Sequence, residues 1–345
     1  MNILIGYGTR PEYVKLFPLI KELGKHFLVR TLRFRQHVDL VTDDSSHQVE
    51  IPEGHNRLDA ILSSINSIDP DVFKDITHVI VQGDTHSALA LALAAYNRGI
   101  KIVHLEAGLR TYDRSNPYPE EGTRQIISRI SDINLCPTVG NRLNLESEKA
   151  PGDNHVVGNT GLDSLLDARP NYSYTKRVFI TLHRRENHPQ IREWFASIDL
   201  AASVHPDLEF ILPIHPNPNV SVHRGMLKYV KVVDPINYSD FKEVLLTARY
   251  FITDSGGIQE EAAFLGKKCV ILRKTTERPE VLPLGSKLCL HPQDLGEHLA
   301  WMDNNFEGEP SDVFGDGRSS ERVVQVFKGS LTNLNMGSDM VTDLV

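Results

Sequence analysis

Short runs of apolar and β-branched residues alternate with longer stretches of helical periodicity along almost the whole chain. The apolar runs are residues 1–7, 78–82, 101–105 and 133–137, followed by 177–182, 208–213, 230–233, 250–253, 268–272 and 286–290. This alternation is typical of βαβ units, in which helices cover both faces of a mostly parallel sheet. Because the pattern runs through two cycles, it predicts two α/β domains, which leave room for a cleft between them.

The two cycles are separated by a polar segment that contains a proline. Residues 161–168 have helical character, and Pro170 and the polar residues after it come before the next apolar run. We therefore predict a first domain over residues 1–168 and a second over 169–316. A last helical segment is expected at about 317–330. The weak periodicity of residues 331–345 indicates a loosely held tail.

Composition narrows the possible functions. The chain of 345 residues is long enough for two cores, and its net charge of -8 gives no reason to expect nucleic acid as a partner. Its apolar stretches are too short for a membrane span or a secretory segment. Cys136, Cys269 and Cys289 are too widely spaced to indicate a zinc site or a disulfide framework. A cytoplasmic location is expected.

Ionisable side chains or glycine turns follow six of the predicted strands. They lie at residues 8–12, 83–85, 106–110, 183–187, 215–218 and 254–257. Helix capping could explain any one of them, because Asp, Ser and Thr often start helices and glycine makes turns. In open α/β sheets, however, ligands bind at the carboxyl ends of the strands. The coincidence of six such segments therefore favours a ligand site.

The segment "DSGGIQEEAAFLG", residues 254–266, suggests which kind of ligand binds. At a strand-to-helix turn, Ser255, Gly256 and Gly257 would expose backbone N–H groups and let an anion such as a diphosphate approach closely. Glu261 would then accept hydrogen bonds from ribose hydroxyls, or simply stabilise the first helical turn. Neither a complete dinucleotide fingerprint nor a phosphate-loop motif occurs, so NAD binding would rest on the fold alone.

Nine short motifs occur in order between residue 1 and about residue 328: "GTRPE", "GDT", "EAGLRT", "PEEGTR", "GNTGLDSL", "HRREN", "HPNP", "TDSGGIQEEA" and "TTERPE". With them the chain resembles the non-hydrolysing UDP-N-acetylglucosamine 2-epimerases. The resemblance implies an α/β, GT-B-like fold of two Rossmann-like domains with mostly parallel sheets, an active site in the cleft and a final helix that returns to the first domain. It also implies a homodimer that needs neither a cofactor nor a metal.

The matching motifs imply a set of site residues. Those implicated in catalysis are Asp84, Glu106, Glu120 and His183. Those implied in substrate binding are Arg10, Lys15, Arg124, His215, Phe241, Ser255, Gly256, Gly257, Glu261 and Arg278. Without the resemblance, Phe241 would be interpreted as a core residue and His183 as a structural histidine.

The implied reaction inverts carbon 2 of the sugar by expelling UDP, which gives a 2-acetamidoglucal intermediate, and then adding UDP back. Inversion requires acid/base groups on opposite sides of the sugar, a role that suits Asp84, Glu106 and Glu120. Which carboxylate acts on which face stays open. His183 and the turn at Ser255 would stabilise the negative charge of the leaving diphosphate.

Several alternatives remain at this point. A hydrolysing epimerase would release N-acetylmannosamine and UDP, and the true substrate could be a modified UDP-sugar. A GT-B glycosyltransferase would share the diphosphate turn but would not need the acids of the first domain. A nucleotide-sugar-binding protein without turnover would not need them either. The family region matching residues 34–62 is shortened here, although Gln36 and His37 persist, which argues against regulation by a second substrate molecule.

Overall fold

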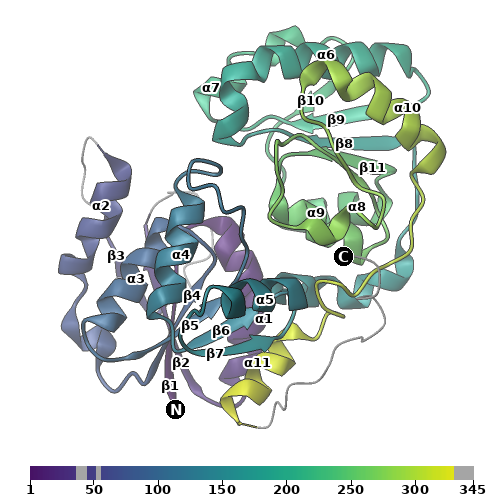
Figure 1. Ribbon diagram of the computed structural model, residues 1–345. Helices are drawn as coiled ribbons and strands as arrows, with labels where there is room; N and C mark the ends of the chain where they lie inside the picture. Colours follow the sequence, from purple (N-terminus) through teal and green to yellow (C-terminus); the bar gives the residue numbers. More distant parts are fainter. Residues whose placement is uncertain (36–44, 52–55, 330–345) are drawn as a thin grey trace. The chain divides into compact units, whose positions relative to one another are not determined.

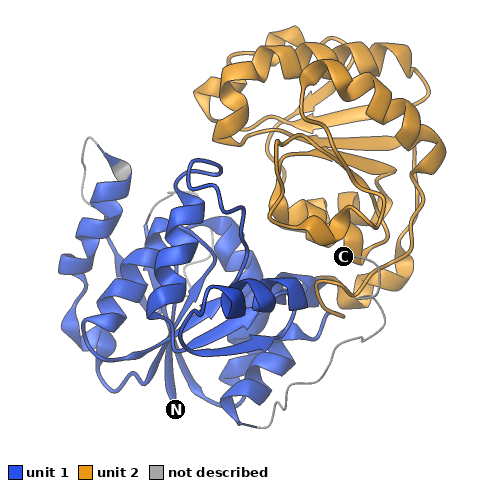
Figure 2. Cartoon of the chain, in the orientation of Figure 1, with its two compact units in different colours: residues 1–164, 317–345 blue, residues 165–316 orange. Residues whose placement is uncertain are grey.

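A computed structural model describes residues 1–35, 45–51 and 56–329 (Figure 1). Contacts divide the chain into two compact units (Figure 2). The first comprises Met1–Ser164 and the segment that begins at Gly317, and the second is Leu165–Asp316. The boundary predicted after residue 168 lies a few residues further along the chain. Gln36, His37 and the predicted tail at 331–345 lie outside the described residues.

The first unit contains a seven-stranded, fully parallel sheet in the order β3-β2-β1-β4-β5-β6-β7. Its strands are β1 (Asn2–Tyr7), β2 (Leu28–Phe34), β3 (His47–Val49), β4 (His78–Gln82), β5 (Lys101–Leu105), β6 (Ile133–Cys136) and β7 (Asp153–Val156). The chain leaves β1 towards β2 on one side and returns to β4 on the other. In such sheets, ligands bind at the carboxyl ends of the strands, at the point where the strand order reverses.

Helices cover both faces of this sheet (Figure 1). They are α1 (Arg10–Gly24), α2 (Arg57–Ser63), α3 (His86–Tyr96), α4 (Glu120–Ile130), α5 (Val139–Ser147) and α11 (Ser319–Phe327). The alanine-rich α3 is buried along most of its length in the core on one face. On the other face, Val323 and Val324 of α11 join the core with Leu16 and Leu19 of α1. The last described helix therefore belongs to the first unit.

The sequence pattern missed three strands of the first unit, β2, β3 and β7. In β2, Arg30 and Arg33 interrupt the apolar run, although the Arg33 side chain is buried. The strands β3 and β7 lie at the two edges of the sheet and are short and polar. Edge strands are often short and polar in native sheets, which protects their unpaired backbone groups from pairing with another chain.

The second unit contains a six-stranded parallel sheet in the order β10-β9-β8-β11-β12-β13. Its strands are β8 (Arg177–Thr181), β9 (Glu209–Pro213), β10 (Lys231–Val233), β11 (Tyr250–Thr253), β12 (Cys269–Ile271) and β13 (Lys287–Leu288). The helices α6 (Ile191–Val204), α7 (Pro218–Ser221), α8 (Tyr238–Thr247), α9 (Gly256–Phe264) and α10 (Leu295–Asn305) pack around it. All six strands predicted for this half are present, and the α/β class with parallel sheets is confirmed.

Two further features bear on the sequence expectations. Cys136, Cys269 and Cys289 are buried and free. Among the described residues, no helix is both long and apolar enough to cross a bilayer.

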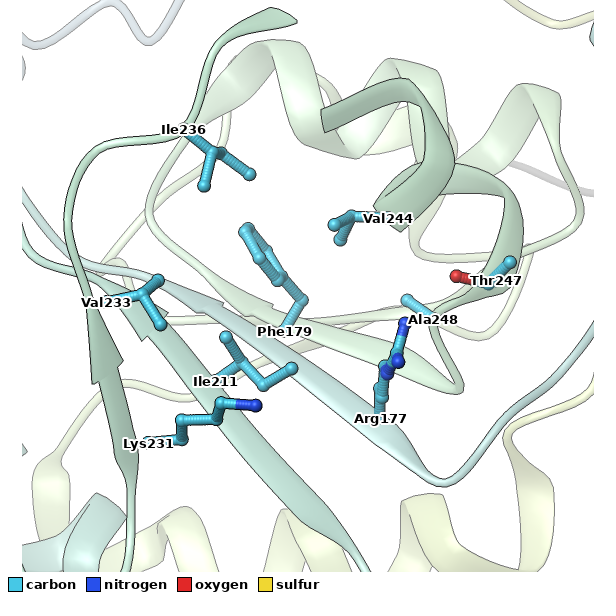
Figure 3. Close-up of a pocket in the computed structure, with 9 residues that line it drawn as sticks. All are labelled: Arg177, Phe179, Ile211, Lys231, Val233, Ile236, Val244, Thr247 and Ala248. Atoms are coloured by element: carbon cyan, nitrogen blue, oxygen red, sulfur yellow. The ribbon is translucent and has the colours of Figure 1, made fainter. Parts of the chain in front are cut away.

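A mainly apolar cavity of about 210 Å³ lies between α8 and the strands β8, β9 and β10, where Phe179, Ile211 and Val244 contribute to its wall (Figure 3). None of the predicted site residues lines this cavity.

Candidate active site

Glu106 lies at the carboxyl end of β5 and faces a cation from a different element. Lys15, on α1, places its Nζ 2.8 Å from both carboxylate oxygens of Glu106. Gln82, the last residue of β4, also donates a side-chain hydrogen bond to Glu106. The Glu106 backbone has a φ of 64°, which is rare for a residue other than glycine and recurs at functional sites. The structure thus joins two of the predicted residues, Lys15 and Glu106, in one partly buried contact.

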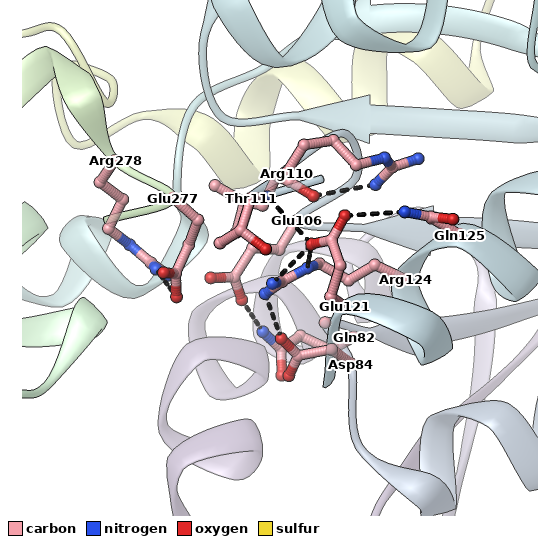
Figure 4. A network of polar contacts seen from close by, with 12 residues as sticks. Gln82, Asp84, Glu106, Arg110, Thr111, Glu121, Arg124, Gln125, Glu277 and Arg278 are labelled. Carbon is pink, nitrogen blue, oxygen red and sulfur yellow. Dashed lines mark hydrogen bonds and ion pairs between the residues drawn. The ribbon is translucent and has the colours of Figure 1, made fainter. Parts of the chain in front are cut away.

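Asp84 follows β4 and is held by Arg124 of α4 (Figure 4). Arg124 Nη1 lies 2.7 Å from Asp84 Oδ2, and Arg124 Nη2 lies 2.9 Å from Glu121 Oε2. The Arg124 and Glu121 side chains are almost fully buried, whereas the Asp84 carboxylate is partly exposed. Arg124 therefore pairs with one partly exposed carboxylate, Asp84, and with one buried carboxylate, Glu121.

Glu121 was not predicted as a site residue, because Glu120 was chosen from the same motif. Its carboxylate accepts hydrogen bonds from Thr111 N at 3.0 Å, Tyr112 N at 3.2 Å and Gln125 Nε2 at 2.9 Å. Burial alone would raise its pKa, but Arg124 and these hydrogen bonds hold the pKa below the ordinary value. Glu121 fastens the segment after β5 to α4. Glu120 begins α4 and is partly buried.

Glu12 joins the two turns that follow β1 and β4. Its carboxylate accepts from Thr9 N at 2.7 Å in a capping box at the start of α1, and from Thr85 Oγ1 at 2.6 Å. Burial raises the pKa of Glu12, while the hydrogen bonds from Thr85, Thr9 and Gly8 oppose that rise. The motif "GTRPE" contains this glutamate, but helix capping would have been its only interpretation from sequence. Arg10, the first residue of α1, is exposed.

In the second unit, the fully buried Asp254 organises the segment after β8. Its Oδ2 accepts from His183 N at 2.9 Å, Arg184 N at 2.7 Å and Asn187 Nδ2 at 3.1 Å. Its Oδ1 lies 3.6 Å from His183 Nδ1. Partial removal from water lowers the pKa of His183, and the Asp254 carboxylate opposes that change. Asp254 was not predicted, although it begins the segment on which the diphosphate prediction rested.

The rings of His183 and His215 are stacked. Their centroids are 5.3 Å apart with an interplanar angle of 17°, and His215 Nδ1 accepts a hydrogen bond from Asn217 N at 3.1 Å. His215 is exposed, whereas His183 is about a third exposed at 35%. The two histidines therefore form one aromatic surface at the carboxyl ends of β8 and β9.

The glycine turn before α9 differs from the expected turn in two contacts. The Ser255 N–H donates to Thr253 Oγ1 at 2.9 Å, so this donor is used within the chain. A Cβ at Gly256 would lie 2.3 Å from Arg278 Nη1, whereas a Cβ at Gly257 would meet nothing within 4 Å. Gly256 thus makes room for an arginine of the same unit, whereas Gly257 borders open space.

Arg278 belongs to a buried chain of charged residues. It donates to Glu260 through Nε and to Glu277 Oε1 through Nη1, the second at 2.8 Å. Arg273 Nη1 donates to the other oxygen of Glu277 at 2.7 Å, and Arg273 Nε donates to Glu186 Oε1 at 2.8 Å. The three glutamates were not predicted. A buried arginine needs acidic partners, so "EEA" and "TTERPE" contained a signal for two of them.

Two further predicted binding residues lie on helices of the second unit. Phe241 on α8 packs its ring 5.6 Å from that of Phe179, and it is partly buried. Glu261 lies on α9 and is also partly buried. Within residues 1–35, 45–51 and 56–329, no three His, Cys, Asp or Glu side chains are arranged to hold a metal ion.

The two units offer different chemistry. In the first, Asp84 and Glu106 follow neighbouring parallel strands whose last residues, Gln82 and Leu105, are paired. Two carboxylates that lie together at the carboxyl ends of neighbouring strands can exchange protons with a substrate. In the second, histidines and a helix that starts at a glycine turn suit the binding of an anion.

Known proteins match nearly the whole chain. Residues 20–328 match the family model described as UDP-N-acetylglucosamine 2-epimerase. The UDP-N-acetylglucosamine 2-epimerase of Neisseria meningitidis is 35% identical over 325 residues, which cover 83% of this chain and 86% of that protein.

Solved structures are similar over nearly the whole chain. The Neisseria meningitidis UDP-GlcNAc 2-epimerase bound to UDP-GlcNAc has a TM-score of 0.87 and 30% identity, and covers 95% of this chain and 100% of its own. The Methanocaldococcus jannaschii UDP-GlcNAc 2-epimerase in complex with UDP-GlcNAc and UDP has a TM-score of 0.84 and 29% identity, with the same coverage of 95% and 100%.

Proposed function

The chain belongs to the UDP-N-acetylglucosamine 2-epimerase family, and from this premise we propose that it reversibly converts UDP-N-acetylglucosamine into UDP-N-acetylmannosamine. The reaction expels UDP to give 2-acetamidoglucal and then adds UDP back after protonation from the opposite face. The observation that carries the proposal is the placement of Asp84 and Glu106 on neighbouring strand ends, each against a cation.

The first unit would handle the protons of the reaction. Removal of the carbon 2 proton and its return from the other face need two acid/base groups, and Asp84, Glu106 and Glu120 are the candidates. Lys15 and Arg124 balance the charges of Glu106 and Asp84 and fix their orientation.

The second unit would hold UDP. His183, whose backbone N–H donates to Asp254, and the amino terminus of α9 would stabilise the charge on the diphosphate as the anomeric bond breaks. His215 and Phe241 would contact the uridine, and Glu261 would bind ribose hydroxyls. Arg10 and Arg278 complete the proposed binding set, which contains no cofactor or metal. A cytoplasmic homodimer is part of the same proposal.

Incubation with UDP-N-acetylglucosamine in deuterated water, followed by NMR, tests the reaction. We expect deuterium at carbon 2 of a sugar that is still attached to UDP. Free UDP with N-acetylmannosamine would instead establish a hydrolysing enzyme, and binding without any exchange would establish a protein without turnover. UDP-sugars with other substituents at carbons 3 and 6, offered in parallel, test whether a modified sugar is preferred.

A further inference from the structure

A buried histidine lies directly beneath the two proposed proton-handling carboxylates. His104 is on β5, two residues before Glu106, and has no exposed surface. Its Nε2 lies 2.8 Å from the carbonyl oxygen of Gly83, the residue before Asp84. A carbonyl can only accept, so Nε2 must carry the proton and donate it. The neighbouring strand therefore holds the peptide that leads into Asp84.

Both backbone polar groups of Gly83 form hydrogen bonds with β5. Its N–H donates to Leu105 O at 2.9 Å, while its carbonyl accepts from His104. Its φ of 68° falls in the left-handed region, where glycine is favoured. The turn thus departs from regular strand geometry at the point where Asp84 must be presented, and two hydrogen bonds to β5 keep it there.

The surroundings of His104 keep it neutral. Burial lowers the pKa of His104 to about 4, and the positive charge of Arg110 also lowers it. The hydrogen bond to Gly83 and the negative charges of Asp84 and Glu106 oppose this decrease. Its Nδ1 is buried and makes no hydrogen bond to any described residue, so a proton there would have no acceptor in the part of the chain that the structure describes. The neutral tautomer protonated on Nε2 satisfies these contacts.

We infer that His104 is a positioning residue, which holds the Gly83–Asp84 turn on β5 and so fixes the distance between the Asp84 and Glu106 carboxylates. The inference rests on the proposed function for its effect on turnover. His104 itself is covered and would not touch the sugar. A loose turn would leave UDP binding in the second unit unchanged but would misplace one of the two carboxylates during proton transfer.

Three variants test the inference. His104→Leu fills the space but removes the donor, and His104→Gln restores an N–H at a similar distance from the backbone. His78→Leu is the matched control, because His78 is a buried histidine at the other end of the adjacent strand, with its ring against Phe327. We expect His104→Leu to lower kcat by on the order of 10- to 100-fold with unchanged UDP affinity. His104→Gln should recover most of that loss, and His78→Leu should keep wild-type kcat.

The tautomer is measured separately, without substrate. Proton–nitrogen correlation spectra of the histidine rings, with the His104 signal assigned by its loss in His104→Gln, should show a neutral ring protonated on Nε2 at neutral pH. A proton on Nδ1, a loss confined to KM, equal losses in His104→Gln and His104→Leu, or an equal loss in His78→Leu would each overturn the inference. If the wild type turns over no UDP-sugar, the proposed function fails, and the spectrum still decides whether His104 holds the turn.

Discussion

The Arg278 guanidinium occupies the space that a side chain at position 256 would fill. A Cβ on Gly256 would lie 2.3 Å from Arg278 Nη1 and 2.6 Å from Arg278 Cζ. The guanidinium cannot simply swing away, because Glu260 and Glu277 hold it from two directions. Two consecutive glycines therefore have different functions, since Gly256 accommodates an arginine and Gly257 borders open space.

We predict that Gly256→Ala lowers the free energy of unfolding far more than Gly257→Ala does. The first change must displace Arg278 and disturb a buried charge network, which costs about 3 kcal/mol or more when one partner of such a network is lost. Gly257→Ala adds a methyl group to space that is open in the protein and that the bound diphosphate would enter, so it should weaken UDP binding with little change in stability. Urea denaturation measures stability, and titration calorimetry with UDP measures affinity. Equal stability of the two variants would show that Gly256 does not have to make room for Arg278.

We predict that Glu106→Gln abolishes epimerisation and spares UDP binding. Loss of an acid/base group typically costs on the order of 10²- to 10⁴-fold in rate. The amide keeps the size of the side chain but can neither accept a proton from carbon 2 nor return one to it. Deuterium incorporation from solvent measures the reaction, and Glu22→Gln on α1, whose partner Lys25 is exposed, is the surface control. Turnover at the wild-type rate would remove Glu106 from the mechanism.

We predict that Glu121→Gln lowers the free energy of unfolding by about 2 kcal/mol or more, because it removes a fully buried charge opposite Arg124. The loss of stability should be smaller than if Arg124 lost every acidic partner, because Asp84 still pairs with it. Urea denaturation measures the change. Glu146→Gln, which breaks a partly exposed pair with Arg142, should change stability by less than about 1 kcal/mol. Similar effects of the two substitutions would contradict the assigned burial.

We predict a pH dependence of stability that His104 causes. Its pKa is about 4 in the folded chain, against an ordinary value of 6.5. Between these values the unfolded chain binds a proton that the folded chain does not, so stability is full above pH 6.5 and falls as the pH drops towards 4. The total effect is on the order of 3 kcal/mol. His104→Gln should flatten the wild-type profile of unfolding free energy between pH 6.5 and 4, and an unchanged slope would refute the assignment.

The sequence alone predicted the fold class and the position of most strands. Each of the ten predicted apolar runs contains a strand. Strands that are buried on both faces need a continuous apolar sequence, and such runs are visible in the sequence itself. The same reasoning missed β2, whose arginines pack within the first unit, and the short edge strands β3 and β7. Motifs also identified the family, and most of them lie at the carboxyl end of a strand.

Only the tertiary structure decided which polar residues act together. Lys15 and Glu106 are 91 positions apart, and His183 and Asp254 are 71 positions apart, yet each pair is in contact. The sequence determined the chemical groups at each strand end, because those depend on local order alone. Their partners depend on strand order and register, which arise when the whole sheet packs. Glu121, Asp254 and His104 are buried beneath the groups they orient, and no local pattern distinguishes such residues from ordinary capping or core residues.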